Sequence, residues 1–180
     1  MSDRHRQQWE ALGRVDPYWA VISEPGKKGG RWDPEDFFAS GANEIRAVLA
    51  RAAALGIDPA RGHALDYGCG VGRLTRALAG EFASAVGVDF SESMLAEARR
   101  ANAGIANARF ERNDGRSLAA IASGSIDFAY SVIALQHSPA AAQREVIREF
   151  GRVVAPEGVV VFQTPSRPNL RTASGIAFRL

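Results

Sequence analysis

Three glycines, Gly68, Gly70 and Gly72, alternate with other residues shortly after Asp66. Because glycine adopts positive φ at little steric cost, such a loop can turn a strand directly into a helix. The missing side chains also let a ligand approach the backbone, and a helix start favours a negative group. The pattern predicts a binding loop for a nucleoside-type cofactor. A tight strand-to-helix turn without a ligand is the alternative interpretation.

The spacing of these glycines distinguishes between classes of cofactor. The dinucleotide fingerprint G-x-G-x-x-G would place its third glycine at position 73, where this chain has Arg73. A phosphate-binding P-loop needs Gly-Lys-Ser/Thr, and the only lysines, Lys27 and Lys28, lie far from such a context. An acidic Asp66 beside the loop disfavours a pyrophosphate and suits a ligand with a positive amino group. A nicotinamide-dependent oxidoreductase is therefore the weaker alternative.

A second acidic residue, Asp89, ends the next apolar run. Its carboxylate has two acceptor oxygens, which match the two hydroxyls of a ribose. The alternative is that Asp89 caps the following helix, but Ser91 is better placed for that role. Cys69 lies inside the glycine loop and is expected to fit there as a small residue.

Further polar residues follow two later apolar runs. Residues 113–115 close the third run and could contact the edge of an adenine, although Asn, Asp and Gly are also common in plain turns. Ser131 ends the fourth run, and Gln136 and His137 follow it. Since ligands of doubly wound sheets bind at the carboxyl ends of strands, His137 is a candidate general base. A surface histidine bonded to backbone is the alternative.

The arrangement of elements must bring these residues together. After residue 62, short apolar runs alternate with helical patterns, which predicts an α/β fold with a doubly wound, mainly parallel sheet of about five strands. Strands are expected at 64–67, 85–89, 108–112, 126–131 and 159–162, helices at 73–82, from 91 onward and at 140–154, and a turn at 156–158. Residues 108–112 alternate as an edge strand would.

The N-terminal region differs from the rest. It holds all three tryptophans, Trp9, Trp19 and Trp32. Asp33 followed by Pro34 is typical of a helix start, and apolar residues recur at helical spacing over 45–55. We expect a helical, aromatic N-terminal extension at 1–41, an α/β domain at 42–166 and a tail at 167–180. The extension is interpreted equally well as a lid over the cofactor and as an ordinary packing layer.

Composition limits the classes of protein. With 180 residues, 46% of them hydrophobic, the chain can form one domain with a sizeable core. The net charge is only +2 and no basic run is present, so no nucleic-acid partner is expected. The single cysteine excludes an internal disulfide, and the scattered histidines show no metal-ligand spacing with it. A polar N-terminus and the absence of a long apolar run favour a cytoplasmic protein without a membrane partner.

Residues 42–166 resemble class I S-adenosylmethionine-dependent methyltransferases of the small-molecule type. Residues 66–72 are similar to the glycine-rich first motif of that family, and residues 88–95 to its second motif, in which the acid holds the ribose. Residues 113–115 match the adenine-contacting position, and residues 131–137 match the fourth-strand motif. Residues 150–158 are similar to the turn before strand five, although Glu157 replaces its first glycine. Residues 1–41 resemble an N-terminal extension of some bacterial members.

The resemblance implies S-adenosylmethionine as the cofactor and a small molecule as the methyl acceptor. It implies that Asp66 lies near the cofactor's amino group, that Asp89 holds its ribose and that Asp114 holds its adenine. His137 would act as a base where the acceptor must lose a proton. The cofactor-binding residues expected on this basis are Asp66, Gly68, Cys69, Gly70, Asp89, Phe90, Met94, Asn113, Asp114, Gly115 and Ser131.

One departure from the family pattern concerns the end of the chain. The family's sheet normally has seven strands, whereas the alternation here stops at five. Part of the family's substrate pocket comes from the region after strand five. A second hypothesis is therefore a non-catalytic or truncated cofactor-binding module that needs a partner. An open fifth strand could also pair with a second copy of the chain.

Overall fold

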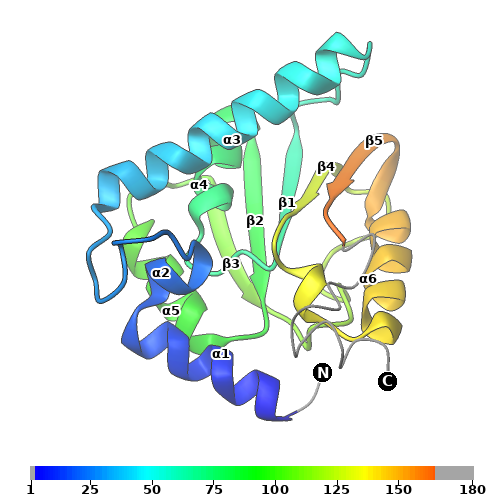
Figure 1. Ribbon diagram of the computed structural model, residues 1–180. Coiled ribbons are helices and arrows are strands. Elements are labelled where there is room, and N and C mark those ends of the chain that lie inside the picture. The colour runs from blue at the N-terminus through cyan, green and yellow to red at the C-terminus, as the bar shows by residue number, and fades with distance from the viewer. Residues whose placement is uncertain (1–2, 165–180) are drawn as a thin grey trace.

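The computed structural model describes residues 3–164 and contains one five-stranded, entirely parallel sheet (Figure 1). The strand order β3-β2-β1-β4-β5 confirms the doubly wound α/β fold expected from the sequence, and β3 lies at an edge of the sheet. The expected tail at 167–180 lies outside the described residues. The strands are β1 (His63–Tyr67), β2 (Ser84–Asp89), β3 (Ala108–Arg112), β4 (Ile126–Ser131) and β5 (Val154–Phe162).

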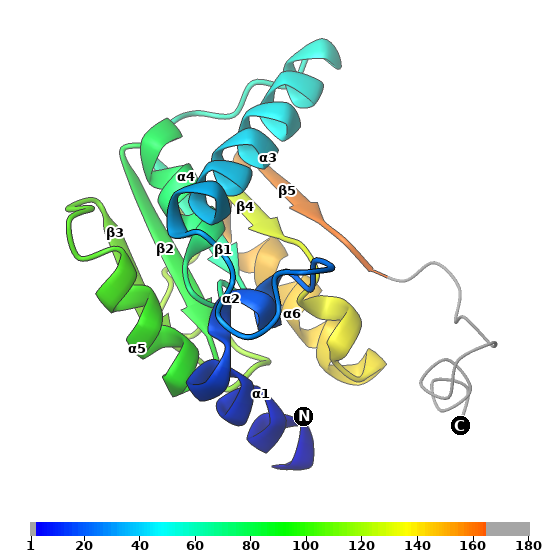
Figure 2. The ribbon, with the colours of Figure 1, turned by 60° about the vertical axis from the view of Figure 1, so that its left-hand side comes forward.

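Helices cover both faces of the sheet (Figure 2). On one face lie α3, α4 and α5, while α6 packs on the other, and α1 and α2 lie near the carboxyl ends of the strands. The helices are α1 (Asp3–Val15), α2 (Pro17–Val21), α3 (Pro34–Ala54), α4 (Arg73–Glu81), α5 (Glu92–Ala101) and α6 (Ala140–Val153), with a short 3₁₀ helix, η1 (Leu135–His137).

The core follows from the alternation of side chains along the strands. In β1, Leu65 and Tyr67 belong to an apolar cluster with Phe150 of α6. Ala64, one residue out of phase, belongs to a cluster with Leu78 of α4 on the opposite face. A third cluster joins the N-terminal segment to the glycine loop, and its buried members are Trp32, Phe37, Phe38, Val71 and Met94.

The start of α3 agrees with the capping pattern in the sequence. One carboxylate oxygen of Asp33 accepts hydrogen bonds from the backbone N–H groups of Glu35 (2.9 Å) and Asp36 (3.0 Å). The helix is longer than the periodicity at 45–55 indicated. It includes residues 41 and 42, where the expected extension meets the expected α/β domain. A Cβ at Gly41 would lie 2.6 Å from the carbonyl oxygen of Arg73, so glycine lets α3 approach the start of α4 closely. The expected N-terminal extension is thus joined to the α/β region by one continuous helix.

The region around β5 differs from the expected turn. Residues 156–158 lie within β5, and the helix before them ends at Val153. Val154 pairs with Ile126, and the next partner pair is Val159 with Phe128, so the residues between Val154 and Val159 form a bulge against β4. The turn-forming residues Pro156 and Gly158 are therefore accommodated as an irregularity inside a strand rather than as a break between elements.

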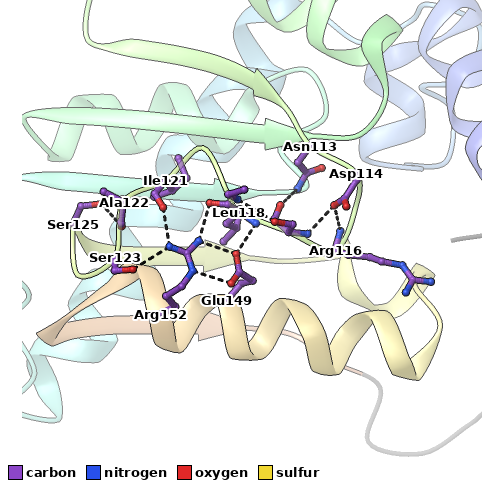
Figure 3. Close-up of polar contacts among 12 residues, drawn as sticks. Asn113, Asp114, Arg116, Leu118, Ile121, Ala122, Ser123, Ser125, Glu149 and Arg152 are labelled. Carbon is purple, nitrogen blue, oxygen red and sulfur yellow. Dashed lines mark hydrogen bonds and ion pairs between the residues drawn. The ribbon is translucent and has the colours of Figure 1, made fainter.

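The segment between β3 and β4 is anchored to α6 by Arg152 (Figure 3). Its guanidinium donates to the carbonyl oxygens of Ile121 (3.0 Å) and Leu118 (2.9 Å) and pairs with the Glu149 carboxylate at 2.8 Å. The same carboxylate accepts the backbone N–H of Leu118 at 2.8 Å. This pair therefore fixes the loop that follows residues 113–115.

We expect Arg152→Ala to lower the free energy of unfolding by about 2 kcal/mol, because two carbonyls and one carboxylate lose a charged donor.

The ion pair with Arg152 lowers the pKa of Glu149 to about 2. A carboxyl whose pKa is depressed in the folded state adds stability above its unfolded pKa, and this stability is lost as pH falls from about 4.5 toward 2. Urea unfolding over this range should show a steeper loss for the wild type than for Glu149→Gln. Equal losses of stability in the wild type and in Glu149→Gln would contradict a lowered pKa of Glu149 in the folded protein.

Candidate active site

A cavity lies at the carboxyl ends of β1, β2 and β4. Strand order reverses between β1 and β4, which is the point where open α/β sheets bind their ligands. The cavity is lined by the glycine loop and by residues at the ends of these strands, and most of the side chains that border it are apolar. The expected site residues that border it are Gly68, Cys69, Gly70, Asp89, Phe90, Met94, Asn113, Gly115 and His137.

The glycine loop forms the floor of this cavity. Gly68 and Gly70 have φ values of 75° and 52°, a region that disfavours any residue with a side chain. A Cβ at Gly68 would lie 2.3 Å from the Cβ of Ala134, which follows β4. The loop is held to β2 by hydrogen bonds from Gly68 N–H to the Val88 carbonyl (2.8 Å) and from Gly70 N–H to Asp89 Oδ2 (2.9 Å). Glycine is thus needed both for the backbone conformation and for close contact with the neighbouring loop.

Asp89 lies at the cavity wall at the end of β2 and is 8% exposed. Its Oδ2 accepts from Gly70 N–H and its Oδ1 accepts from Ser91 N–H, both at 2.9 Å. Burial raises the pKa of this carboxyl, while the backbone N–H groups, chiefly that of Ser91, oppose the rise. Because each carboxylate oxygen can accept two hydrogen bonds, both retain capacity for a ligand hydroxyl. Ser91 caps α5 through its side chain, so Asp89 is not the side-chain cap of that helix.

Asp66 occupies a different position. It is 1% exposed, does not border the cavity, and its Oδ2 accepts a hydrogen bond from the Thr75 hydroxyl at 2.7 Å. Burial is the main cause of a pKa raised to about 7, and the Thr75 hydroxyl partly offsets it. The acid thus lies beneath the glycine loop, between β1 and α4.

This burial predicts a pH-dependent stability. An acid whose pKa is higher in the folded than in the unfolded state loses stability as pH rises from about 4 to about 7. Asp66→Asn keeps an acceptor for Thr75 but removes the charge. We therefore expect it to be more stable than the wild type by at least about 1 kcal/mol at pH 8, with a smaller difference at pH 4. Urea unfolding at the two pH values measures this, and equal differences at both would contradict the prediction.

Of the expected site residues at the ends of β3 and β4, some border the cavity and others do not. Asn113 and Gly115 border the cavity, whereas Asp114 and Ser131 do not. One carboxylate oxygen of Asp114 accepts from the backbone N–H groups of Arg116 (2.8 Å) and Ser117 (2.7 Å), so it stabilises its own turn (Figure 3). The Ser131 hydroxyl donates to the carbonyl of Tyr67 at 3.0 Å and ties the end of β4 to the end of β1.

The N-terminal helices close the cavity opposite the sheet. Trp9 of α1 and Val21 of α2 border it together with His137 of η1. The rings of Trp9 and His137 meet edge to face, with centroids 5.6 Å apart. Val21 lies directly over the loop, because a Cβ at Gly70 would be 2.7 Å from its Cγ2. His137 is exposed, and its Nε2 lies 3.4 Å from the side-chain nitrogen of Gln136.

Arg73 borders the cavity and was not among the expected site residues. Its side chain is 3% exposed and pairs with Glu44 of α3 at 2.7 Å, and Glu44 also accepts from the Tyr130 hydroxyl at 2.9 Å. The Nε of Arg73 is buried without a hydrogen-bond partner among the described residues. The sequence does mark this position, since an arginine stands where a dinucleotide fingerprint has glycine. No comparable signal marks Trp9 or Val21.

Two further findings apply to residues 3–164. No group of three or more His, Cys, Asp or Glu side chains there is arranged to hold a metal ion. No helix in that range is long and apolar enough to cross a membrane.

Comparison with known proteins identifies the family. The sequence profile of the family described as "Methyltransferase domain" matches residues 64–158, and the chain belongs to this family. It is 30% identical over 155 residues to a 2-methyl-6-phytyl-1,4-hydroquinone methyltransferase of Synechocystis sp., covering 86% of this chain and 48% of that protein. It is 34% identical over 145 residues to a trans-aconitate 2-methyltransferase of Deinococcus radiodurans, covering 75% of this chain and 50% of that protein. The chain thus spans about half the length of these curated relatives.

A solved structure supports the same conclusion. The DhpI–SAH complex superimposes with a TM-score of 0.62 at 25% sequence identity, over 89% of this chain and 68% of DhpI. The resemblance to methyltransferases inferred from the glycine loop and Asp89 is therefore confirmed at the level of the family.

Proposed function

We propose that this chain binds S-adenosylmethionine in the cavity and transfers its methyl group to a small molecule. The observation that carries the proposal is the junction of the glycine loop with Asp89 at the strand-order reversal. Membership of a methyltransferase-domain family and the likeness to a SAH complex of DhpI support it.

The residues at the cavity fit such a cofactor. Asp89 keeps acceptor capacity on both oxygens for the ribose hydroxyls. Phe90 and Met94 offer apolar contacts to the adenine ring, and Asn113 a polar contact to its edge. The buried, unpartnered Nε of Arg73 suits the carboxylate of the methionine part, which would rest on the glycine loop.

Three of the expected contacts would be indirect. Asp66 lies beneath the loop, so its carboxyl group, in the fraction that is ionised at neutral pH, would favour the cofactor's amino group without touching it. Asp114 and Ser131 would act through the turn and the strand ends that they fix. The bound cofactor supplies an electrophilic methyl on a sulfonium, and the residues around the cavity position the acceptor in line with it. His137 would accept the acceptor's proton where one must be lost.

The test combines binding and turnover of the full chain. Titration calorimetry should show binding of S-adenosylhomocysteine, and mass spectrometry of a metabolite mixture incubated with S-adenosylmethionine should show a singly methylated product. Absence of S-adenosylhomocysteine binding would overturn the proposal. Binding without any methylated product would favour the second hypothesis, a non-catalytic module that needs a partner.

We also propose that a second copy of the chain pairs with β5. This strand lies at an edge of the described sheet, and Phe162 at its end is 41% exposed. An edge strand presents unpaired backbone groups that can accept another strand. Sedimentation of the full chain over a range of concentrations tests this, and a monomer throughout would contradict it. A cytoplasmic location and the absence of a nucleic-acid partner are part of the same proposal.

A further inference from the structure

A second hollow, here called the outer chamber, adjoins the cofactor cavity beneath the N-terminal helices. Trp9, Val21, Ile133 and His137 border both spaces, and Trp19 and Gln163 border the chamber alone. A molecule in the chamber would therefore share one wall with the proposed cofactor, and the candidate base His137 belongs to that wall.

Most of the described residues that border the chamber are apolar, and none of them carries a permanent charge. Among the described residues that line it there is no lysine, arginine, aspartate or glutamate. Its polar groups are neutral, apart from the titratable imidazole of His137, and include the amides of Gln136 and Gln163. Lys28 lies 5.0 Å from the ring of Trp19 but is not part of the lining. Among the described residues that border this space, none offers a cationic partner to a carboxylate, whereas two indole rings suit a flat, neutral molecule.

A strained residue lies at the boundary between the two spaces. Ile133 has a φ of 61°, which is a genuine outlier for a β-branched side chain. Its N–H donates to the side-chain oxygen of Gln163 at 3.3 Å, and its side chain is 38% exposed. Because strained backbone tends to persist at ligand sites, this conformation is an independent indication that the wall serves binding.

We propose that the outer chamber binds the methyl acceptor and that this acceptor is a neutral aromatic compound bearing a hydroxyl group. The proposal rests on the proposed function, whose site it extends. In the reaction the acceptor oxygen forms a bond to the methyl carbon as the carbon–sulfur bond breaks. The hydroxyl proton passes to His137 and then to water, and the products are the methyl ether and S-adenosylhomocysteine.

Calorimetry of the full chain with two matched ligands tests the chamber. Methylhydroquinone is neutral, and 2,5-dihydroxybenzoate carries a carboxylate on the same ring; both are titrated under nitrogen, with and without S-adenosylhomocysteine. We expect methylhydroquinone to bind at least about tenfold more tightly. Equal affinity, preference for the carboxylate, or no binding of either ligand would overturn the proposal. Failure of S-adenosylhomocysteine alone to bind would overturn the proposed function instead, and methylhydroquinone binding would still support the chamber.

Two substitutions of Gln163 locate the binding. Gln163→Arg adds a cation at the chamber and should shift the preference toward 2,5-dihydroxybenzoate by about tenfold. Gln163→Met loses the same hydrogen bond to Ile133 without adding charge and should leave the preference unchanged. Ser23→Arg adds a cation at another exposed part of the lining. It tests the same shift in ligand preference if Gln163→Arg does not fold. An unchanged preference in folded arginine variants would place the ligand elsewhere and overturn the proposal.

Discussion

Replacing Asp89 with alanine is expected to weaken S-adenosylhomocysteine binding by at least about 100-fold, a loss of roughly 2.7 kcal/mol. The substitution removes both acceptor oxygens proposed for the ribose. It also leaves the N–H groups of Gly70 and Ser91 without their acceptor, so the glycine loop loses its connection to the end of β2. Titration calorimetry at pH 7.5 measures the loss.

Two controls separate the contact with the ligand from damage to the loop. Asp89→Asn keeps the shape and one acceptor oxygen, and its affinity should lie between those of the wild type and the alanine variant. Ser91→Ala removes the cap of α5 but leaves Asp89 in place, so its affinity should stay within about threefold of the wild type. Wild-type affinity in a folded Asp89→Ala protein would show that this carboxylate does not hold the ribose.

Local sequence patterns predicted the sheet and the glycine loop. Apolar runs such as the one around Leu65 are buried on both faces because the strands are parallel and covered by helices on each side. Positive φ at Gly68 and Gly70 follows from the strand-to-helix turn, so both the loop and the family could be inferred from a short stretch of sequence. These features depend on neighbours in the chain and not on distant contacts.

Features that depend on distant contacts could not be predicted in this way. The ion pair between Arg73 and Glu44 joins residues 29 positions apart, and no local pattern indicates it. The placement of Trp9 over the cavity depends on how α1 packs against α5, which hydrogen bonds from the α5 start to the Glu10 carboxylate help to fix. Asp66 is a different case, because it follows Ala64 by two residues and so faces α4, a direction that strand alternation could have indicated.

Replacing His137 with alanine is expected to lower kcat for a hydroxyl acceptor by about 100-fold or more, while affinity for S-adenosylhomocysteine stays within about threefold. The reason is that the imidazole would accept the proton as the acceptor oxygen attacks, a role that does not affect the bound cofactor. The rising limb of the pH–rate profile should disappear in the variant. His63→Ala is the matched control, because His63 is also exposed but lies at the start of β1, where its ring bonds to Ser84.

A series of phenols then separates a base from a residue that only shapes the wall. Phenols with a pKa below the assay pH have already lost their proton, so the defect of His137→Ala should shrink steadily as the phenol becomes more acidic. If His137 only supports Trp9 by edge-to-face packing, the defect should be the same for every phenol and should affect KM at least as much as kcat. A uniform defect, or an unchanged kcat, would contradict the assignment of His137 as the base.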